Sequence, residues 1–151
     1  MNKVRSQCRY RGFTMLEIIL VLAILGLMLS IALPSGLTIY QRTLLRNTAN
    51  EIESALVMAR QLSMDESKQY EVLLSDTRFG IRESISTGKR VRSWDYPKGI
   101  RKAVTSDDRI SFNRRGVTGY GKFTIENTRK DRVDIEIHIG TGRVVLSDVY
   151  R

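Results

Sequence analysis

Cysteine, histidine and proline are scarce in this sequence. Its 151 residues include one cysteine, one histidine and two prolines. Cys8 lies in a basic N-terminal stub, so a chain without that stub has neither a disulfide nor a cysteine metal site. His138 lies between two isoleucines of an alternating stretch, and no carboxylate pair or activated nucleophile accompanies it. We therefore expect no enzyme activity, no metal and no cofactor.

A long apolar run near the N-terminus is the strongest feature that is present. Residues 13–33 contain a single charge, Glu17, and four Lys or Arg with no acid precede them in residues 1–12. As a helix at about 1.5 Å per residue, this run spans roughly 30 Å, the thickness of a bilayer's hydrocarbon core. The positive-inside bias then keeps residues 1–12 in the cytoplasm and puts the body outside the cytoplasmic membrane. We expect a single-pass anchor.

Glu17 is an unusual residue for such a run. A carboxylate in lipid is costly, although less so near the end of a span, where Glu17 lies. One interpretation is that its side chain reaches back to the membrane surface. The other is that it meets a positive partner. Cleavage after Gly12 would free an amine at Phe13, and the amine of a neighbouring subunit would neutralise Glu17 as helices pack side by side.

Residues 11–17, Arg-Gly-Phe-Thr-Met-Leu-Glu, followed by the apolar run, resemble the class III leader of type IV pilins and type II secretion pseudopilins. The resemblance implies that a prepilin peptidase cuts after Gly12 and methylates Phe13, and that Glu17 serves assembly. Two alternatives remain. Ser30-Ile31-Ala32 is a small-x-small ending of the kind that follows a secretory signal peptide, and the run would also serve as an uncut anchor.

The rest of the chain reads as a helix followed by strands. Apolar residues recur at steps of three and four from Leu37 to Leu62, which predicts an amphipathic helix to about Asp65. After Ser67 the period changes to two, with the clearest strand around residues 133–139. We read residues 84–108 as a short strand and a loop. The expected fold is α+β and pilin-like, with a long N-terminal helix packed on a C-terminal antiparallel sheet.

The expected organisation has four parts. A cleaved leader covers residues 1–12, a transmembrane and assembly helix 13–33, an amphipathic continuation 34–67 and an extracytoplasmic β domain 68–151. Residues 110–116, 121–123 and 140–144 further resemble the GspH/FimT-like group of minor pseudopilins, and most of all its Gram-positive competence members. This implies a minor subunit of a DNA-uptake pilus that contacts other major and minor pseudopilins, the peptidase and the cytoplasmic membrane. The alternatives are a membrane-tethered DNA receptor and a pseudopilin of a type II secretion system.

The net charge of +9 favours anionic partners, and residues 13–151 keep +5 of it. Basic residues gather near the C-terminus at expected strand ends and turns, where they would give sequence-independent, salt-sensitive DNA binding. The alternative is a solvated basic surface, or one that pairs with an acidic neighbour. The candidate DNA-binding residues are Arg114, Arg115, Lys122, Arg129, Lys130, Arg132 and Arg143.

Overall fold

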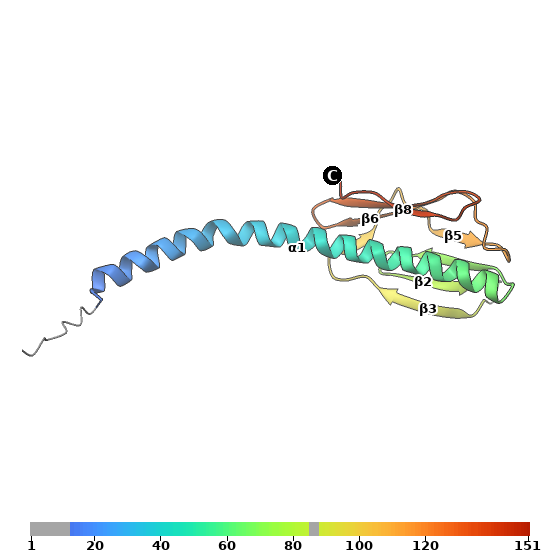
Figure 1. Cartoon of the computed structure of the whole chain (residues 1–151), viewed down its shortest axis with the longest axis horizontal. Helices are drawn as coiled ribbons and strands as arrows, with labels where there is room; N and C mark the ends of the chain where they lie inside the picture. Colours follow the sequence, from blue (N-terminus) through green and yellow to red (C-terminus); the bar gives the residue numbers. More distant parts are fainter. Residues whose placement is uncertain (1–12, 85–87) are drawn as a thin grey trace, which may run out of the picture. The chain divides into compact units, whose positions relative to one another are not determined.

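Residues 13–84 and 88–151 are described by the computed structural model, which consists of one helix followed by eight strands (Figure 1). The helix, α1, runs from Met15 to Asp65. The strands are β1 Tyr70–Leu74, β2 Arg78–Glu83, β3 Arg90–Asp95, β4 Ile100–Lys102, β5 Arg109–Phe112, β6 Gly121–Asn127, β7 Arg132–Ile137 and β8 Val144–Leu146. The expected α+β fold is confirmed.

The chain divides into two compact units, and the division falls inside α1 between Thr38 and Ile39. In the second unit, α1 buries one stripe of small and aliphatic side chains in the core. Its fully buried members recur at steps of three and four, as a helix with one buried face requires: Leu45, Ala49, Ile52, Leu56 and Ala59. Leu37 and Tyr40, expected at the start of this stripe, are exposed.

The strands form two antiparallel sheets rather than the single one expected. The first has the order β3-β2-β1-β5 and the second β4-β6-β7-β8. One hydrophobic cluster joins both sheets to α1, with Val72 and Ile81 from the first sheet and Phe123 and Ile135 from the second. Figure 1 shows both sheets alongside the second half of α1. The second half of α1 therefore packs against the sheets, as the apolar stripe in the sequence predicted.

The two sheets meet where β5 approaches β6. Gly121 lies against Ile110 so closely that an added Cβ would be 2.6 Å from Ile110 Cγ1, which leaves room only for glycine. The connection before β5 bonds to both sheets: the Asp107 N–H donates to the Lys122 carbonyl at 3.0 Å, and the Leu74 N–H donates to the Asp108 carbonyl at 2.9 Å. Gly121 is the first residue of β6.

The region expected to hold a short strand and a loop holds two strands, β3 and β4. β3 is an edge strand with most of its side chains exposed on both faces, so it has no alternation for a pattern to detect. Trp94 of β3 is half-buried and stacks on Phe79 with ring centroids 5.2 Å apart. β4 has only three residues and pairs with β6.

Candidate functional site

The helix begins with a capping arrangement that includes Glu17. Thr14 directly precedes α1, and its Oγ1 accepts a hydrogen bond from the Glu17 N–H at 3.3 Å. Thr-x-x-Glu is the sequence of a capping box, in which Glu or Gln at the third helical position supports the helix start. A carboxylate in the first turn also interacts favourably with the helix dipole. The hydrogen bond in this cap uses the Glu17 backbone N–H, so it does not occupy the Glu17 carboxylate.

The side chains of residues 13–29 are exposed, including the large apolar ones. Phe13 is 78% exposed and Leu16 76% exposed. A contiguous apolar surface of this kind is typical of a segment that contacts a partner or a membrane. Within residues 13–84 and 88–151, no helix is both long enough and apolar enough to cross a bilayer, so the expected span over 13–33 is not confirmed. Gly12 and the rest of the expected leader lie outside the described residues.

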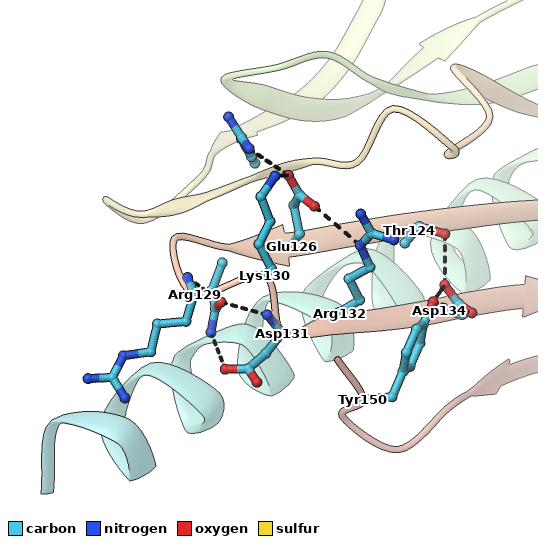
Figure 2. Close-up of polar contacts among 10 residues, drawn as sticks. Thr124, Glu126, Arg129, Lys130, Asp131, Arg132, Asp134 and Tyr150 are labelled. Atoms are coloured by element: carbon cyan, nitrogen blue, oxygen red, sulfur yellow. Dashed lines mark hydrogen bonds and ion pairs between the residues drawn. The ribbon is translucent and has the colours of Figure 1, made fainter. Parts of the chain in front are cut away.

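A buried carboxylate neutralises part of the predicted DNA-binding set. Glu126 on β6 is 4% exposed at its side chain and accepts from three cations, as Figure 2 shows for Lys130 and Arg132. The nitrogen–oxygen distances are 2.7 Å to Arg101, 3.1 Å to Lys130 and 3.2 Å to Arg132. We call these four residues the Glu126 cluster. The strand register builds it, because Glu126 stands opposite Arg101 on β4 and Arg132 on β7.

The pKa of Glu126 follows from this environment. Burial is the largest single influence and on its own would raise the pKa, since it disfavours the charged form. The hydrogen bonds from Lys130, Arg101 and Arg132 together outweigh it, and the pKa is lowered from its ordinary value of 4.5. Glu126 is thus a carboxylate at neutral pH, and its three cations already have an anion.

Lys122, another predicted DNA contact, has its own carboxylate. Its Nζ lies 2.7 Å from Asp134 and 3.5 Å from Glu136 on the neighbouring strand. Asp134 also accepts from the Thr124 hydroxyl at 2.7 Å and from the Tyr150 hydroxyl at 2.9 Å (Figure 2). The hydrogen bond with Asp134 is the main reason that the pKa of Lys122 is raised.

Arg129 lies in the turn between β6 and β7, which Asn127 holds in place. The Asn127 amide oxygen accepts from the backbone N–H of Arg129 at 2.9 Å and of Asp131 at 3.0 Å, and its amide nitrogen donates to the Asp131 carboxylate (Figure 2). Asp131 in turn pairs with Arg42 of α1 at 3.3 Å. The side chains around this turn therefore serve the attachment of the hairpin to the helix.

The remaining predicted arginines lie on two turns that contact one helix residue, Arg60. A Cβ added at Gly116 would lie 3.3 Å from Arg60 Cγ, and one added at Gly142 would lie 2.9 Å from Arg60 Nε. Both glycines have positive φ, 70° and 60°, which favours glycine at each position. Exposed arginines adjoin both glycines, so the fold brings the two turns together. We call Arg60, Arg114, Arg115 and Arg143 the Arg60 cluster.

No carboxylate in the described residues pairs with the Arg60 cluster. Arg60 Nε is buried and has no hydrogen-bond partner among the described residues. A buried N–H left without an acceptor costs about 1–3 kcal/mol. The nearby backbone offers little, since Asn113 Oδ1 already accepts from the N–H groups of Arg115 and Val117.

The structure thus divides the predicted DNA-binding residues. It places Arg114, Arg115 and Arg143 on two turns whose glycines pack against Arg60, a residue that sequence reasoning missed. It places Lys122, Lys130 and Arg132 in ion pairs elsewhere. Arg60 gave no sequence signal, because the turns that contact it are far along the chain. The described residues also contain no group of three or more His, Cys, Asp or Glu arranged for a metal, and the expectation of no metal or cofactor stays a prediction.

Comparison with known proteins gives three concordant findings. Residues 8–33 match a family model described as the prokaryotic N-terminal methylation motif. The competence protein ComGD of Bacillus subtilis is 24% identical over 136 residues, which cover 89% of this chain and 91% of ComGD. The fold is similar to that of the type IV minor pilin FimU of Pseudomonas aeruginosa, with a TM-score of 0.57 and 16% identity over 70% of this chain and 90% of FimU. The chain therefore has the N-terminal methylation motif and a pilin-like fold.

A second solved structure supports the same placement. EpsH, a minor pseudopilin of the Type 2 Secretion System of Vibrio cholerae, matches this pilin-like chain with a TM-score of 0.56. The identity is 8%, and the match covers 69% of this chain and 96% of EpsH. At such identities the structural likeness shows the fold alone.

Proposed function

We propose that this pilin-like chain is a minor pseudopilin of a competence machine, a subunit of the pilus-like filament used for DNA uptake. The similarity to ComGD carries the proposal, because it extends over 89% of the chain rather than over the N-terminal motif alone. The pilin-like fold and the methylation motif are consistent with it. The activity is structural: the chain acts by assembling with other major and minor pseudopilins, without catalysis.

The N-terminal segment is the assembly element in this proposal. A prepilin peptidase cuts after Gly12 and methylates Phe13, and the apolar segment 13–33 holds the chain in the cytoplasmic membrane until it enters the filament. The exposure of the apolar side chains of residues 13–29 supports this role, since a filament or a bilayer would cover them. The body, residues 68–151, is then displayed outside the membrane.

Glu17 is the residue on which assembly depends, through its charge. Its carboxylate meets the free amine of a neighbouring subunit's first residue, and the pair neutralises two charges that are costly in an apolar environment. The hydrogen bond from the Glu17 backbone N–H to Thr14 Oγ1 does not involve the carboxylate, so a substitution of the side chain leaves that bond in place. Glutamine is the sharpest substitution, since it keeps the size and polarity of the side chain and removes its charge.

The experiment compares Glu17→Gln with Thr14→Ala in the native host. We expect Glu17→Gln to reduce filament incorporation and transformation at least about tenfold, and Thr14→Ala, which weakens the cap by about 1 kcal/mol, to have a small effect. A chain cleaved after Gly12 lacks Cys8, so Val104→Cys, at a position 99% exposed, provides a unique thiol for maleimide labelling of surface filaments. Normal labelling and transformation in Glu17→Gln would overturn the assembly role.

Two other functions are distinguished by the same variants. If the chain is a membrane-tethered DNA receptor that does not polymerise, cells with Glu17→Gln should be transformed normally, because tethering does not need the charge. If the chain is instead a secretion pseudopilin, cells that lack it should fail to export a secreted protein and should still be transformed normally. The similarity to ComGD favours competence over both.

A further inference from the structure

We propose that the free edge of β3 is a docking site at which an extended, acidic segment of a neighbouring subunit adds to the first sheet. The main chain of the segment continues the sheet, and its carboxylates meet the basic side chains of β3. That the segment belongs to a neighbouring subunit rests on the assembly function proposed above. The site uses no residue of the Arg60 cluster or of the exposed apolar segment 13–29.

The first reason is the set of backbone groups at this edge. β3 is the end strand of the first sheet, and among the described residues it pairs only with β2 (Figure 1). The Tyr96 N–H donates to the Thr77 carbonyl at 2.9 Å. In an antiparallel ladder, residues that bond to the neighbouring strand alternate with residues whose backbone groups face away from it. The N–H and C=O groups of Ser93 and Asp95 therefore point to the free edge, where a further strand can bond to them.

The second reason is a hollow beside the edge. Gly80 of β2 lies opposite Ser93, and a Cβ added at Gly80 would be 3.1 Å from Ser93 Cα. Phe79 and Ile81 are buried in the core, so Gly80 between them faces the other side of the sheet. The hollow there has a volume of about 210 Å³, and both Gly80 and Ser93 line it. Strand addition takes affinity from main-chain hydrogen bonds and specificity from hollows that receive alternate side chains, and this edge provides both.

The third reason is charge, which defines what the added segment carries. Arg90 and Arg92 of β3 are exposed, and neither has a carboxylate partner in residues 13–84 and 88–151. Arg90 lines the hollow, and the Arg92 guanidinium lies 5.2 Å from the centre of the Trp94 ring. Basic side chains on an edge strand repel basic strands and so protect the edge from indiscriminate pairing. A strand with carboxylates is the kind that they attract, since opposite charges on neighbouring strands stabilise a sheet.

The test uses Trp94 as the reporter, because it is the only tryptophan of the chain and lies on β3. The probe is a blocked peptide of about nine residues in which glutamate alternates with threonine, a residue that favours strands. It is titrated at low ionic strength into the full-length chain in an uncharged detergent. We expect a saturable change in Trp94 fluorescence, and at least about fivefold weaker binding of the same peptide with glutamine in place of glutamate. No saturable change, or equal binding of the two peptides, would overturn the proposal.

The main-chain contribution is tested from both sides. A peptide methylated on every backbone nitrogen keeps the carboxylates but lacks the donors of a strand, and we expect it to bind at least about tenfold more weakly. Ser93→Pro removes an N–H from the free edge and leaves the bonds between β3 and β2 in place, so it should have a similar effect. Ser93→Ala is its control and should bind as the parent does. Equal binding of the methylated and unmethylated peptides would overturn strand addition, and this comparison decides even if Ser93→Pro does not fold.

The charge contribution is tested with two double variants that change the net charge equally. Arg90→Gln/Arg92→Gln should weaken binding of the glutamate peptide at least about fivefold. Arg114→Gln/Arg115→Gln removes two exposed arginines outside β3 and should change the affinity less than about twofold, because charges away from the contact are largely screened. Equal losses in the two variants would overturn the site in favour of a diffuse basic surface.

The occupant is tested in the native host and by sedimentation. We expect folded Ser93→Pro to enter filaments less than Ser93→Ala does, and normal incorporation of Ser93→Pro would overturn the neighbouring subunit as the source of the segment. A dimer of the parent chain that Ser93→Pro abolishes would assign the edge to a second copy and overturn the acidic partner. The proposed function fails separately: if Glu17→Gln leaves filaments and transformation normal, the assembly role is refuted whether or not β3 binds the peptide. Loss of assembly in Glu17→Gln with no peptide binding at β3 would do the reverse.

Discussion

Two basic regions of this pilin-like chain have similar composition and different chemistry. The Glu126 cluster holds three cations around one buried carboxylate, and the Arg60 cluster holds four arginines with no carboxylate partner among the described residues. The Glu126 cluster stabilises the second sheet, whereas the fold places no acid opposite the Arg60 cluster within the described residues. The comparison teaches that the number of basic residues in a segment does not locate an anion site. What locates it is whether the fold supplies acids opposite them.

The largest effect should come from removing the acid of the Glu126 cluster. Glu126→Gln leaves three neighbouring cations without their anion, and we expect a loss of about 2–3 kcal/mol in the free energy of unfolding, measured with urea. The partners are partly exposed, which keeps the loss below that of a fully buried pair. Glu51→Gln, at an exposed helix position, is the control and should change stability by less than about 0.5 kcal/mol.

The same variant should weaken the contrast between the regions. With Glu126 neutral, Arg101, Lys130 and Arg132 become available to phosphate, so the salt slope of DNA binding should steepen by about 1–2. An unchanged slope would mean that these cations do not face DNA even when they are unpaired. The ion pairs of the Glu126 cluster would then affect the stability of the fold and not DNA binding.

Low pH should weaken the ion pairs of Glu126 and Asp134, whereas the Arg60 cluster contains no carboxylate to protonate. The pKa values of Glu126 and Asp134 are lowered from 4.5 and 3.8, so their contribution is complete above those values and is lost as the pH falls through the folded-state pKa values. We expect the free energy of unfolding to fall as the pH drops below about 4.5. Glu126→Gln should flatten this dependence, and an unaltered profile in that variant would contradict the assignment.

Gly142 tests the backbone beneath the Arg60 cluster. Gly142→Ala places a Cβ 2.9 Å from Arg60 Nε at a φ of 60°, and we expect a loss of about 1–2 kcal/mol together with weaker DNA binding. Gly119→Ala is the matched control, since nothing lies within 4 Å of its added Cβ and its φ is not in the left-handed region. Equal behaviour of the two alanine variants would show that Gly142 does not hold Arg60.

Substitution of Ser67, which lies outside both clusters, should have the smallest effect on stability and provides a reference. It follows α1 with a φ of 52°, a conformation that glycine adopts without strain. Ser67→Gly should therefore stabilise the chain by about 0.5–1 kcal/mol, seen as a higher unfolding temperature. Its DNA affinity should equal that of the parent. A change in affinity would show that global stability, and not local pairing, controls binding.

Periodicity in the sequence was sufficient to predict the main elements of the fold. The three-to-four spacing predicted α1 as far as its end at Asp65, and alternation predicted β7. It gave β3 only as a short strand without bounds, and it missed β4, whose three residues are too few to show a period. It also did not predict that the strands separate into two sheets, which depends on the close approach of Gly121 to Ile110.

The candidate site was only partly predictable for a related reason. The sequence showed where basic residues gather but not which acids face them across the sheet. Alternation does place Lys122 and Glu126 on one face of β6, but the pairing of Glu126 with Arg132 and of Lys122 with Glu136 depends on the strand register, which periodicity does not give. Arg60 was beyond local reasoning, since its neighbours Gly116 and Gly142 reach it only in the folded chain.

The most direct test of the central claim, that this chain is a processed pilin-like subunit, is its intact mass and N-terminal residue when it is recovered from membranes of its native host. Our account predicts a chain that begins at Phe13 and is heavier by one methyl group. A chain that begins at Leu33, or one that retains Met1 and the rest of residues 1–12, would contradict it.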